Sequence, residues 1–267
     1  MRTPEEILPP PGTRAEPQPR PRPEHKRVWA SLEQTPDEVM TAMFDEAAHR
    51  DPDHRKTWVA LVDGNKPQIR ILRQLARERT IPLQIVVDFI HVAEYVWQAG
   101  LAFHPAESPA LDSWVRPRLL EILRGHAGYV AAGMRRSATL RSLTAADRAP
   151  VDACADYLLT YAPYLTYPIA LSTGLPIASG VIEGACRHLV NDRMNLTGAR
   201  WSLSGAEAVL RLRALRSSAD FDDYWVFHET REYQRNHASR YANQQVPGTT
   251  PANQLLPSRR TLTLVKK

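Results

Sequence analysis

The sequence is poor in several features that would assign it to a specialised class of protein. Its 267 residues include only two cysteines, Cys154 and Cys186, which form no C-x-x-C pair and so argue against a zinc knuckle. No apolar run approaches 18 residues, and the N-terminus has no signal-peptide pattern. We therefore expect a cytoplasmic protein without a membrane span, in which both thiols pack as small apolar side chains.

Acidic residues are absent after Glu232, whereas the same tail carries six basic residues. The net charge of the chain is +5, and this tail alone carries +6, so the rest of the chain is close to neutral. Attraction of the whole chain to a polyanion would therefore depend on this tail. The alternative is a solvated tail with no binding role. We assign 239–267 as a basic disordered tail.

Proline is concentrated at the start of the chain. Eight of the first 23 residues are proline, which predicts an extended segment without helix or sheet. We assign 1–26 as a disordered linker. A linker with nothing before it is expected where an upstream domain has been lost.

One strand–helix–strand unit is the clearest structural pattern. Apolar runs at 57–63 and 82–90 predict two buried strands, and the amphipathic segment 66–79 between them predicts a helix. Such a unit has parallel strands and a right-handed crossover. Further helices are expected at 36–50, 91–104, 111–135, 145–162, 180–195, 204–217 and 220–237, three of them with capping boxes that start at Thr35, Thr144 and Ser204.

The predicted fold class is α/β, mostly helical. Two strands are too few for a stable open sheet. The βαβ unit should therefore belong to a partial core whose other strands are absent here or supplied elsewhere.

Two aspartates stand at the ends of the predicted strands. Asp63 closes the first strand, and Asp88 lies near the end of the second. Ligand sites form at the carboxyl ends of parallel strands, and carboxylate oxygens suit a hard cation such as Mg²⁺. The alternative for Asp63, which precedes glycine, is a turn-forming residue.

Glu183 is a third candidate carboxylate, in the first turns of the helix expected after Ser179. Its neighbours are small and apolar, which is unusual for a solvated charge. The alternative is an acidic residue that suits a helix N-terminus or an ion pair with Arg187.

Asp88 and His91 form a D-x-x-H pair. Asp88 could orient His91, or both could approach a metal. The alternative is a buried hydrogen bond between the two side chains that joins strand to helix.

A basic region follows Glu183. Guanidinium groups suit phosphate, and an aromatic ring among them could stack on a base or simply pack. The candidates for DNA contact are Arg187, Arg193, Arg200, Trp201 and Arg211. The alternative is a set of surface arginines on amphipathic helices.

Four sequence blocks together resemble the Kra group of insertion-sequence transposases, relatives of the Mutator-like transposases. The blocks are Trp58–Asn65, Ile85–Trp97, Gly174–Met194 and Leu196–Ser202. The resemblance runs from about residue 27 to 237, and the block around Glu183 is specific.

The resemblance implies an RNase H-like fold with an Asp-Asp-Glu site for Mg²⁺ or Mn²⁺. Asp63 matches the second Asp and Glu183 the Glu, while Asp88 and His91 match an accessory motif. The implied divisions are a partial core at 27–104, a helical insertion at 105–175 and core helices at 176–238. The implied partners are transposon-end and target DNA, with a homo-oligomer when the protein is intact.

The family's first Asp lies on an upstream strand that ends in Asp-Gly, and no residue here matches it. The implied reaction is two-metal phosphoryl transfer, so a truncated chain without one ligand should be inactive alone. In a second reading, Asp63, Asp88 and Glu183 form the triad. The alternative function is a non-catalytic DNA-binding or dimerising fragment that regulates a full-length transposase. A helical scaffold protein is the remaining reading.

Overall fold

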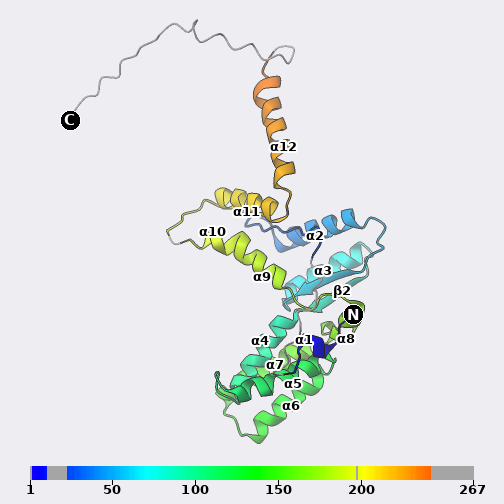
Figure 1. The fold of residues 1–267 in the computed structure, drawn as a ribbon, viewed down its shortest axis with the longest axis vertical. Coiled ribbons are helices and arrows are strands. Elements are labelled where there is room, and N and C mark those ends of the chain that lie inside the picture. Colours follow the sequence, from blue (N-terminus) through cyan, green and yellow to red (C-terminus); the bar gives the residue numbers. More distant parts are fainter. Residues whose placement is uncertain (1, 11–22, 197, 242–267) are drawn as a thin grey trace, which may run out of the picture.

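The computed structural model describes residues 2–10, 23–196 and 198–241, with the backbone alone at 181–183. The molecule is elongated (Figure 1), with a helical lobe at one end, a small sheet near the middle and a projecting helix at the other end. In this part of the chain, no helix combines the length and apolar composition needed to cross a membrane.

The strand–helix–strand unit is confirmed. Strands β1 (Trp58–Val62) and β2 (Leu83–Val87) are parallel, with Val62 paired to Val87, and they are the only strands in the described residues. Helix α3 (Lys66–Glu78) connects them and buries its apolar face. Helix α2 (Pro36–Arg50) also forms as predicted, with the capping box at Thr35 present in full.

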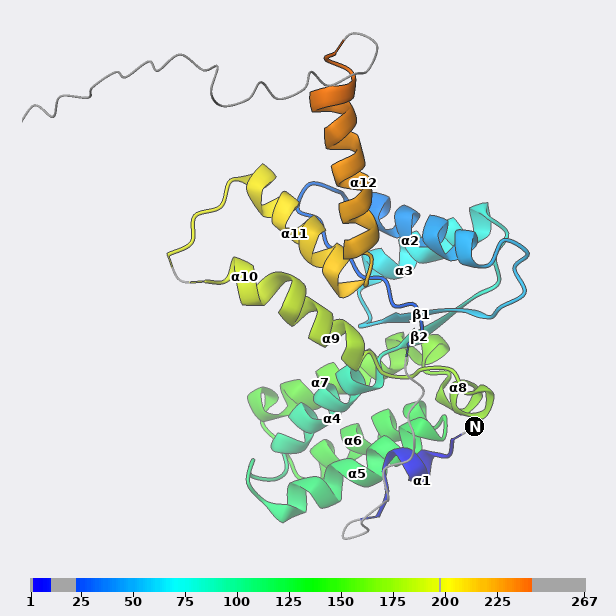
Figure 2. The same ribbon diagram turned by 45° about the horizontal axis from the view of Figure 1, so that its top comes forward.

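The helical lobe is built from α4 to α8 (Figure 2). Its elements are α4 (Phe89–Leu101), α5 (Pro109–Leu123), α6 (Ala127–Leu140), α7 (Ala145–Thr160), the 3-10 turn η1 (Ala162–Tyr164) and α8 (Tyr167–Thr173). The prediction of one helix at 111–135 is wrong, because Gly125 adopts a φ of +90° and separates α5 from α6. The turn and short helix after α7 were not predicted.

The lobe and the sheet share one hydrophobic core. Val86, Val87, Val92 and Val96 have no exposed surface, and they belong to the same buried cluster as the apolar residues of α5 to α8. Tyr167 of α8 is also fully buried and donates a hydrogen bond to the Val87 carbonyl at 2.8 Å. The described parts of the sheet and lobe therefore pack as a unit.

The proline-rich start contains a helical turn that its composition did not predict. Helix α1 (Pro4–Ile7) begins with a capping box at Thr3, and Glu5 pairs at 2.6 Å with Arg124, the residue that follows α5. Proline is compatible with a first helical turn, where its missing N–H has no partner to lose. Residues 11–22 of the predicted linker and 242–267 of the predicted tail lie outside the described residues.

The C-terminal helices leave the sheet and run to the far end. They are α9 (Gly180–Cys186), the π-helical η2 (Arg187–Asn191), α10 (Asp192–Met194), α11 (Leu203–Ser217), α12 (Phe221–Tyr233) and the π-helical η3 (Gln234–Ala238). Cys154 is buried as predicted, but the prediction that Cys186 is also packed is wrong, since it is exposed.

The start of α11 differs from the prediction. Ser202 caps the helix by accepting a hydrogen bond from the Gly205 amide, so the predicted capping box between Ser204 and Glu207 does not form. Glu207 is instead buried and accepts hydrogen bonds from the Leu32 amide and the Ser31 hydroxyl. The Leu32 bond is the first cause of a pKa that is lower than usual for this carboxyl.

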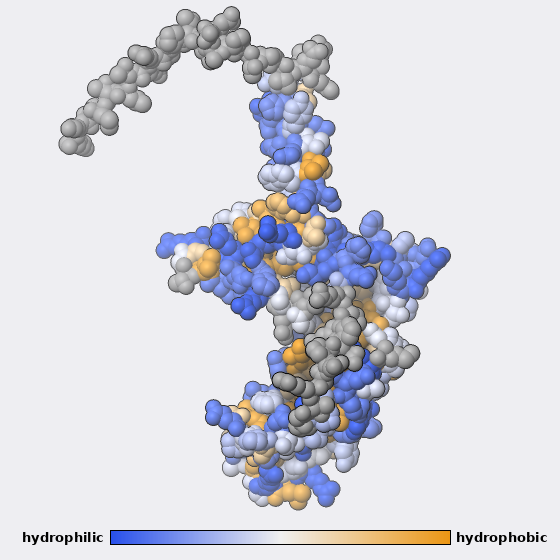
Figure 3. Space-filling model, viewed as in Figure 1, coloured by the Kyte–Doolittle hydropathy of each residue, from blue (hydrophilic) through white to orange (hydrophobic). Residues whose placement is uncertain are grey.

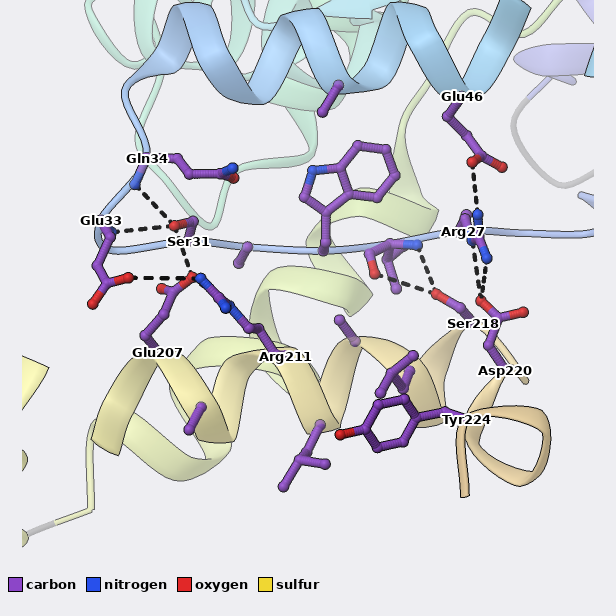
Figure 4. A pocket seen from close by; sticks show the side chains of 18 of the residues that line it. Arg27, Ser31, Glu33, Gln34, Glu46, Glu207, Arg211, Ser218, Asp220 and Tyr224 are labelled. Atoms are coloured by element: carbon purple, nitrogen blue, oxygen red, sulfur yellow. Dashed lines mark hydrogen bonds and ion pairs between the residues drawn. The ribbon is translucent and has the colours of Figure 1, made fainter. Parts of the chain in front are cut away.

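Glu207 thus anchors an extended strap, defined here as residues 27–33, along α11 (Figure 4). At the other end of the strap, Arg27 pairs with Glu46 of α2 at 2.6 Å and with Asp220 at 3.0 Å. Ser218 also exchanges hydrogen bonds with the Val28 backbone. The strap therefore ties α2 to the C-terminal helices.

Candidate functional site

The carboxyl ends of the two strands bring the predicted aspartates to one edge of the sheet. Asp63 and Asp88 directly follow the paired residues Val62 and Val87. The Asp88 amide also donates to the Val62 carbonyl at 2.7 Å, which extends the pairing by one residue. This edge is where a parallel sheet presents ligand-binding groups.

Asp63 lies exposed in a tight turn. Its Oδ1 accepts a hydrogen bond from the Asn65 amide at 2.9 Å, as an Asx turn does, while Oδ2 has no hydrogen bond to any described group. Tyr157 of α7 donates its hydroxyl to the Asp63 carbonyl at 3.0 Å. The Oδ2 of Asp63 is thus open to solvent. The backbone of the turn is fixed by the hydrogen bond from Tyr157 of the helical lobe.

Gly64 fits the same turn for two reasons. Its φ is +91°, a left-handed conformation that strains any residue with a Cβ. A Cβ at this position would also lie 2.9 Å from the Tyr157 hydroxyl oxygen. At Gly64, the helical lobe and the end of β1 are therefore in close contact.

Asp88 has the opposite environment, because it is only 5% exposed. Its Oδ1 accepts from the Ile90 amide at 2.7 Å and so caps α4. Its Oδ2 accepts from the Ser179 amide at 2.7 Å and also from the Ser179 hydroxyl. We name this arrangement of Asp88, Ile90 and Ser179 the Asp88 clamp, and in it both carboxylate oxygens are occupied.

The Asp88 clamp brings the third candidate block to the same edge. Helix α9 starts at Gly180, directly after Ser179, and the Ile177 carbonyl accepts from the Phe89 amide at 2.8 Å. Both ribbon views place the start of α9 beside the start of α4 (Figures 1 and 2). Glu183 therefore lies in the first turn of a helix that begins at the strand ends, although its side chain lies outside the described part.

His91 does not bond Asp88, so the structure shows neither the alternative of a buried hydrogen bond between these side chains nor an orientation of His91 by Asp88. The Asp88 oxygens are directed to the Ile90 amide and to Ser179, while His91 Nδ1 lies 3.2 Å from Glu94 Oε2 on the same helix. The imidazole is part-exposed and packs edge-on against two tyrosine rings, those of Tyr95 and Tyr157.

A tyrosine cluster behind Asp63 was missed from the sequence. The rings of Tyr95 and Tyr157 stack at 4.1 Å between centroids, and Tyr161 lies 4.7 Å from Tyr157. Burial raises the pKa of Tyr157 and of Tyr161, so both hydroxyls stay protonated near neutral pH. The spacing of Tyr157 and Tyr161, four residues apart on a predicted helix, was the available signal.

Among the side chains that the structure describes, carboxylate, cysteine and histidine groups do not gather further at this edge. Where side chains are described, no group of three such residues is placed to hold a metal ion. Because the Glu183 side chain is outside that part of the chain, the described potential ligand is Asp63, with one open oxygen.

The predicted DNA-contacting residues divide into two groups. Arg187 and Arg200 are exposed, and the Arg193 guanidinium lies 5.4 Å from the centre of the half-buried Trp201 ring. Arg211 is instead engaged by two carboxylates, Glu207 at 3.1 Å and Glu33 at 3.6 Å. The first group lies on or just after the helical segment that contains Glu183, whereas Arg211 lies on α11 and contacts Glu33 of the strap.

A groove of about 1270 Å³ runs between α2, the strap and α11 (Figure 4). Of the predicted site residues, only Arg211 lines it. The charged side chains labelled there are joined to one another or to the strap by hydrogen bonds and ion pairs, so these contacts in the groove walls attach the strap.

Searches against protein-family models, curated proteins and solved structures find no match for this chain.

Proposed function

We propose that this chain belongs with the bacterial insertion-sequence transposases of the Kra type, enzymes that act on DNA by metal-dependent cleavage and strand transfer. One observation supports this most directly: three sequence blocks that carry the resemblance meet at one edge of the sheet. Asp63 and Asp88 end adjacent parallel strands, and Ser179 is bonded to Asp88 although 91 residues separate them. The RNase H-like character of the partial core belongs to this proposal.

Asp63 and Glu183 are the proposed catalytic ligands. The open Oδ2 of Asp63 has the chemistry of a ligand for Mg²⁺ or Mn²⁺, which bind carboxylate oxygen. When bound, such ions activate a hydroxyl nucleophile and stabilise the leaving oxygen of a phosphodiester. Asp88 acts as a positioning residue, because it fixes where the helix of Glu183 begins.

The proposed DNA contacts are made by Arg187, Arg193 and Arg200 with Trp201. Their exposed guanidinium groups can pair with phosphate oxygens. The Trp201 ring is close enough to restrict the side-chain conformation of Arg193 through a cation–π contact. Arg211 is left out of this set because two carboxylates, Glu207 and Glu33, pair with it, whereas Arg187 has a single carboxylate, Asp192, at 3.9 Å.

We further propose that these 267 residues alone do not cut DNA. No residue matches the first Asp of the family, and Asp88 cannot replace it while three donors occupy its oxygens. A second candidate function therefore has its own support: a non-catalytic DNA-binding fragment that uses the exposed arginines.

The experiment that tests the proposal measures Mn²⁺ binding by calorimetry on the 267-residue chain. We expect weak binding that Asp63→Ala and Glu183→Ala each abolish, while Glu107→Gln, a substitution in an exposed loop, leaves it unchanged. Duplex DNA binding should weaken steeply with salt and fall in the triple variant Arg187→Ala, Arg193→Ala, Arg200→Ala.

The outcomes separate the two functions. Salt-dependent DNA binding without any Mn²⁺ site at Asp63 would support the DNA-binding fragment instead. Mg²⁺-dependent nicking of DNA by the chain itself, lost in Asp63→Ala, would overturn the proposed inactivity but keep the transposase. Absence of both DNA and metal binding would contradict both functions.

A further inference from the structure

One face of helix α3 carries basic side chains only. Four exposed residues recur at intervals of four, three and four, which is the spacing of a single helix face: Lys66, Arg70, Arg73 and Arg77. We name these four residues the α3 stripe. The buried residues of α3 belong to the core and occupy the other side of the helix. Helix α3 therefore presents the stripe, and not its apolar residues, to solvent.

The charges of the α3 stripe have no counter-charge in the described part of the chain. Several arginines of other helices pair with a carboxylate four residues away, as Arg148 of α7 does with Asp152 at 2.9 Å, and the same spacing recurs in α2 and α11. In the stripe, Arg73 donates instead to the Tyr164 hydroxyl and Arg77 to a backbone carbonyl. Four positive charges are thus left unpaired along one face.

This arrangement disfavours the free helix and favours a polyanion. Like charges one turn apart destabilise a helix, and the stripe contains three such neighbouring pairs. The acidic residue of α3, Glu78, accepts a hydrogen bond from Gln74 and lies about 100° around the helix from Arg77. The stripe is about 16 Å long, a length over which one strand of duplex DNA carries about five phosphates.

The chemistry of the stripe suits a phosphodiester backbone better than a membrane surface. A helix that lies on an anionic membrane inserts an apolar face, but the apolar residues of α3 are already buried in the core. Mainly hydrophilic residues cover α2 and α3 on the face displayed in Figure 3. Guanidinium groups pair with phosphate oxygens, and contacts of this kind carry no sequence information.

The stripe begins beside the candidate site. Asn65 caps α3 and donates its amide to Asp63 Oδ1, and Lys66 is the first residue of the helix. We infer that the α3 stripe binds the phosphodiester backbone of DNA, independently of sequence, and directs it to the carboxyl end of β1. This surface is separate from the arginines proposed above and needs no metal. It rests on the proposed function only in taking DNA as the partner.

The test is binding of a short mixed-sequence DNA duplex to the full 267-residue chain, measured by fluorescence anisotropy without metal over a range of salt concentrations. The stripe variant replaces all four residues: Lys66→Gln, Arg70→Gln, Arg73→Gln and Arg77→Gln. We expect it to bind about a hundredfold more weakly, and the slope of log affinity against log salt to fall by about 3 to 4. A charge-retaining variant, with Lys66→Arg and lysine at the three arginine positions, should keep the slope.

A matched control separates the stripe from net charge. It removes four exposed basic residues that form no ion pair with a described carboxylate and lie in other parts of the chain: Lys56→Gln, Arg136→Gln, Arg216→Gln and Arg240→Gln. Both variants lower the formal charge by four, but the control should weaken binding by less than about tenfold. The melting temperature of the stripe variant should be no lower than that of the wild type, because the replaced charges repelled one another.

The outcomes distinguish this surface from the proposed function. Wild-type affinity in the stripe variant would overturn the inference, and loss of binding on replacing Arg187, Arg193 and Arg200 would then leave the proposed function intact. Equal losses in the stripe variant and the control would also overturn it, as would a lower melting temperature or a reduced slope in the charge-retaining variant. A wild-type chain that binds no duplex would contradict both the stripe and the proposed DNA contacts.

Discussion

The carboxyl ends of β1 and β2 carry the same residue type in opposite environments. Asp63 is exposed, bonded through one oxygen to a neighbouring amide, and held only through its backbone by Tyr157. Asp88 is buried, and both of its oxygens accept hydrogen bonds from two other segments. Position on a strand end thus places a carboxylate at a potential site, but its neighbours decide whether it binds a ligand or organises the fold.

The largest expected effect is at Asp88. Asp88→Ala leaves the Ile90 and Ser179 amides without their partner in a buried place, which should lower the free energy of unfolding by about 3 kcal/mol. Asp63→Ala should cost less than about 1 kcal/mol, because its side chain is exposed. Urea unfolding of the two variants tests the comparison, and equal losses would show that the two strand ends do not differ.

Gly64 should rank next. Gly64→Ala places a methyl group 2.9 Å from the Tyr157 hydroxyl in a left-handed backbone, with an expected loss of about 2 kcal/mol. Tyr157→Phe removes the hydroxyl that the new methyl group would meet. Gly64→Ala should therefore lower the free energy of unfolding by less in a Tyr157→Phe background. A double-mutant cycle of unfolding free energies measures this coupling, and strictly additive losses would argue against contact between turn and lobe.

Ser179 should give the smallest loss of the three. Ser179→Ala removes one hydroxyl donor but keeps the amide bond to Asp88, so we expect a loss of about 1 kcal/mol. The effect should be local, with faster amide hydrogen exchange over 180–186 and unchanged exchange in β1. Ser172→Ala, which removes an exposed hydroxyl within α8, is the matched control. Equal exchange in both variants would mean that the Asp88 clamp does not order α9.

Local sequence patterns predicted the parts of the fold that depend on local contacts. The capping box at Thr35 and the apolar runs around Asp63 and Asp88 gave α2, β1 and β2 close to their observed bounds. Those same runs also predicted that the two aspartates share one edge, because paired parallel strands end together.

Long-range contacts explain what the patterns missed. Tyr157 bonds the Asp63 carbonyl although 94 residues separate them along the chain, and Ser179 bonds Asp88 over a separation of 91 residues. The periodicity of apolar residues carries no information about contacts between such distant positions. Glu207 was misassigned for the same reason: three residues after a serine it resembles a capping residue, whereas the strap contacts that bury it come from 175 residues away. Asp88 is another such case: the sequence suggested His91, three residues away, as its partner, whereas the structure shows Ser179.

The strap also constrains the order in which the chain can fold. Residues 27–33 leave the ribosome early, but their partners Glu207 and Ser218 are synthesised 175 to 190 residues later. Contacts of such wide separation form slowly, because a long loop must close before they contribute. The residues of the strand pair and the helical lobe lie within 58–173. These parts can therefore assemble before α11, which carries the strap's partner Glu207, has been synthesised. The tie between α2 and the C-terminal helices can therefore form only after α11 has been synthesised, and it cannot form if synthesis stops before Glu207.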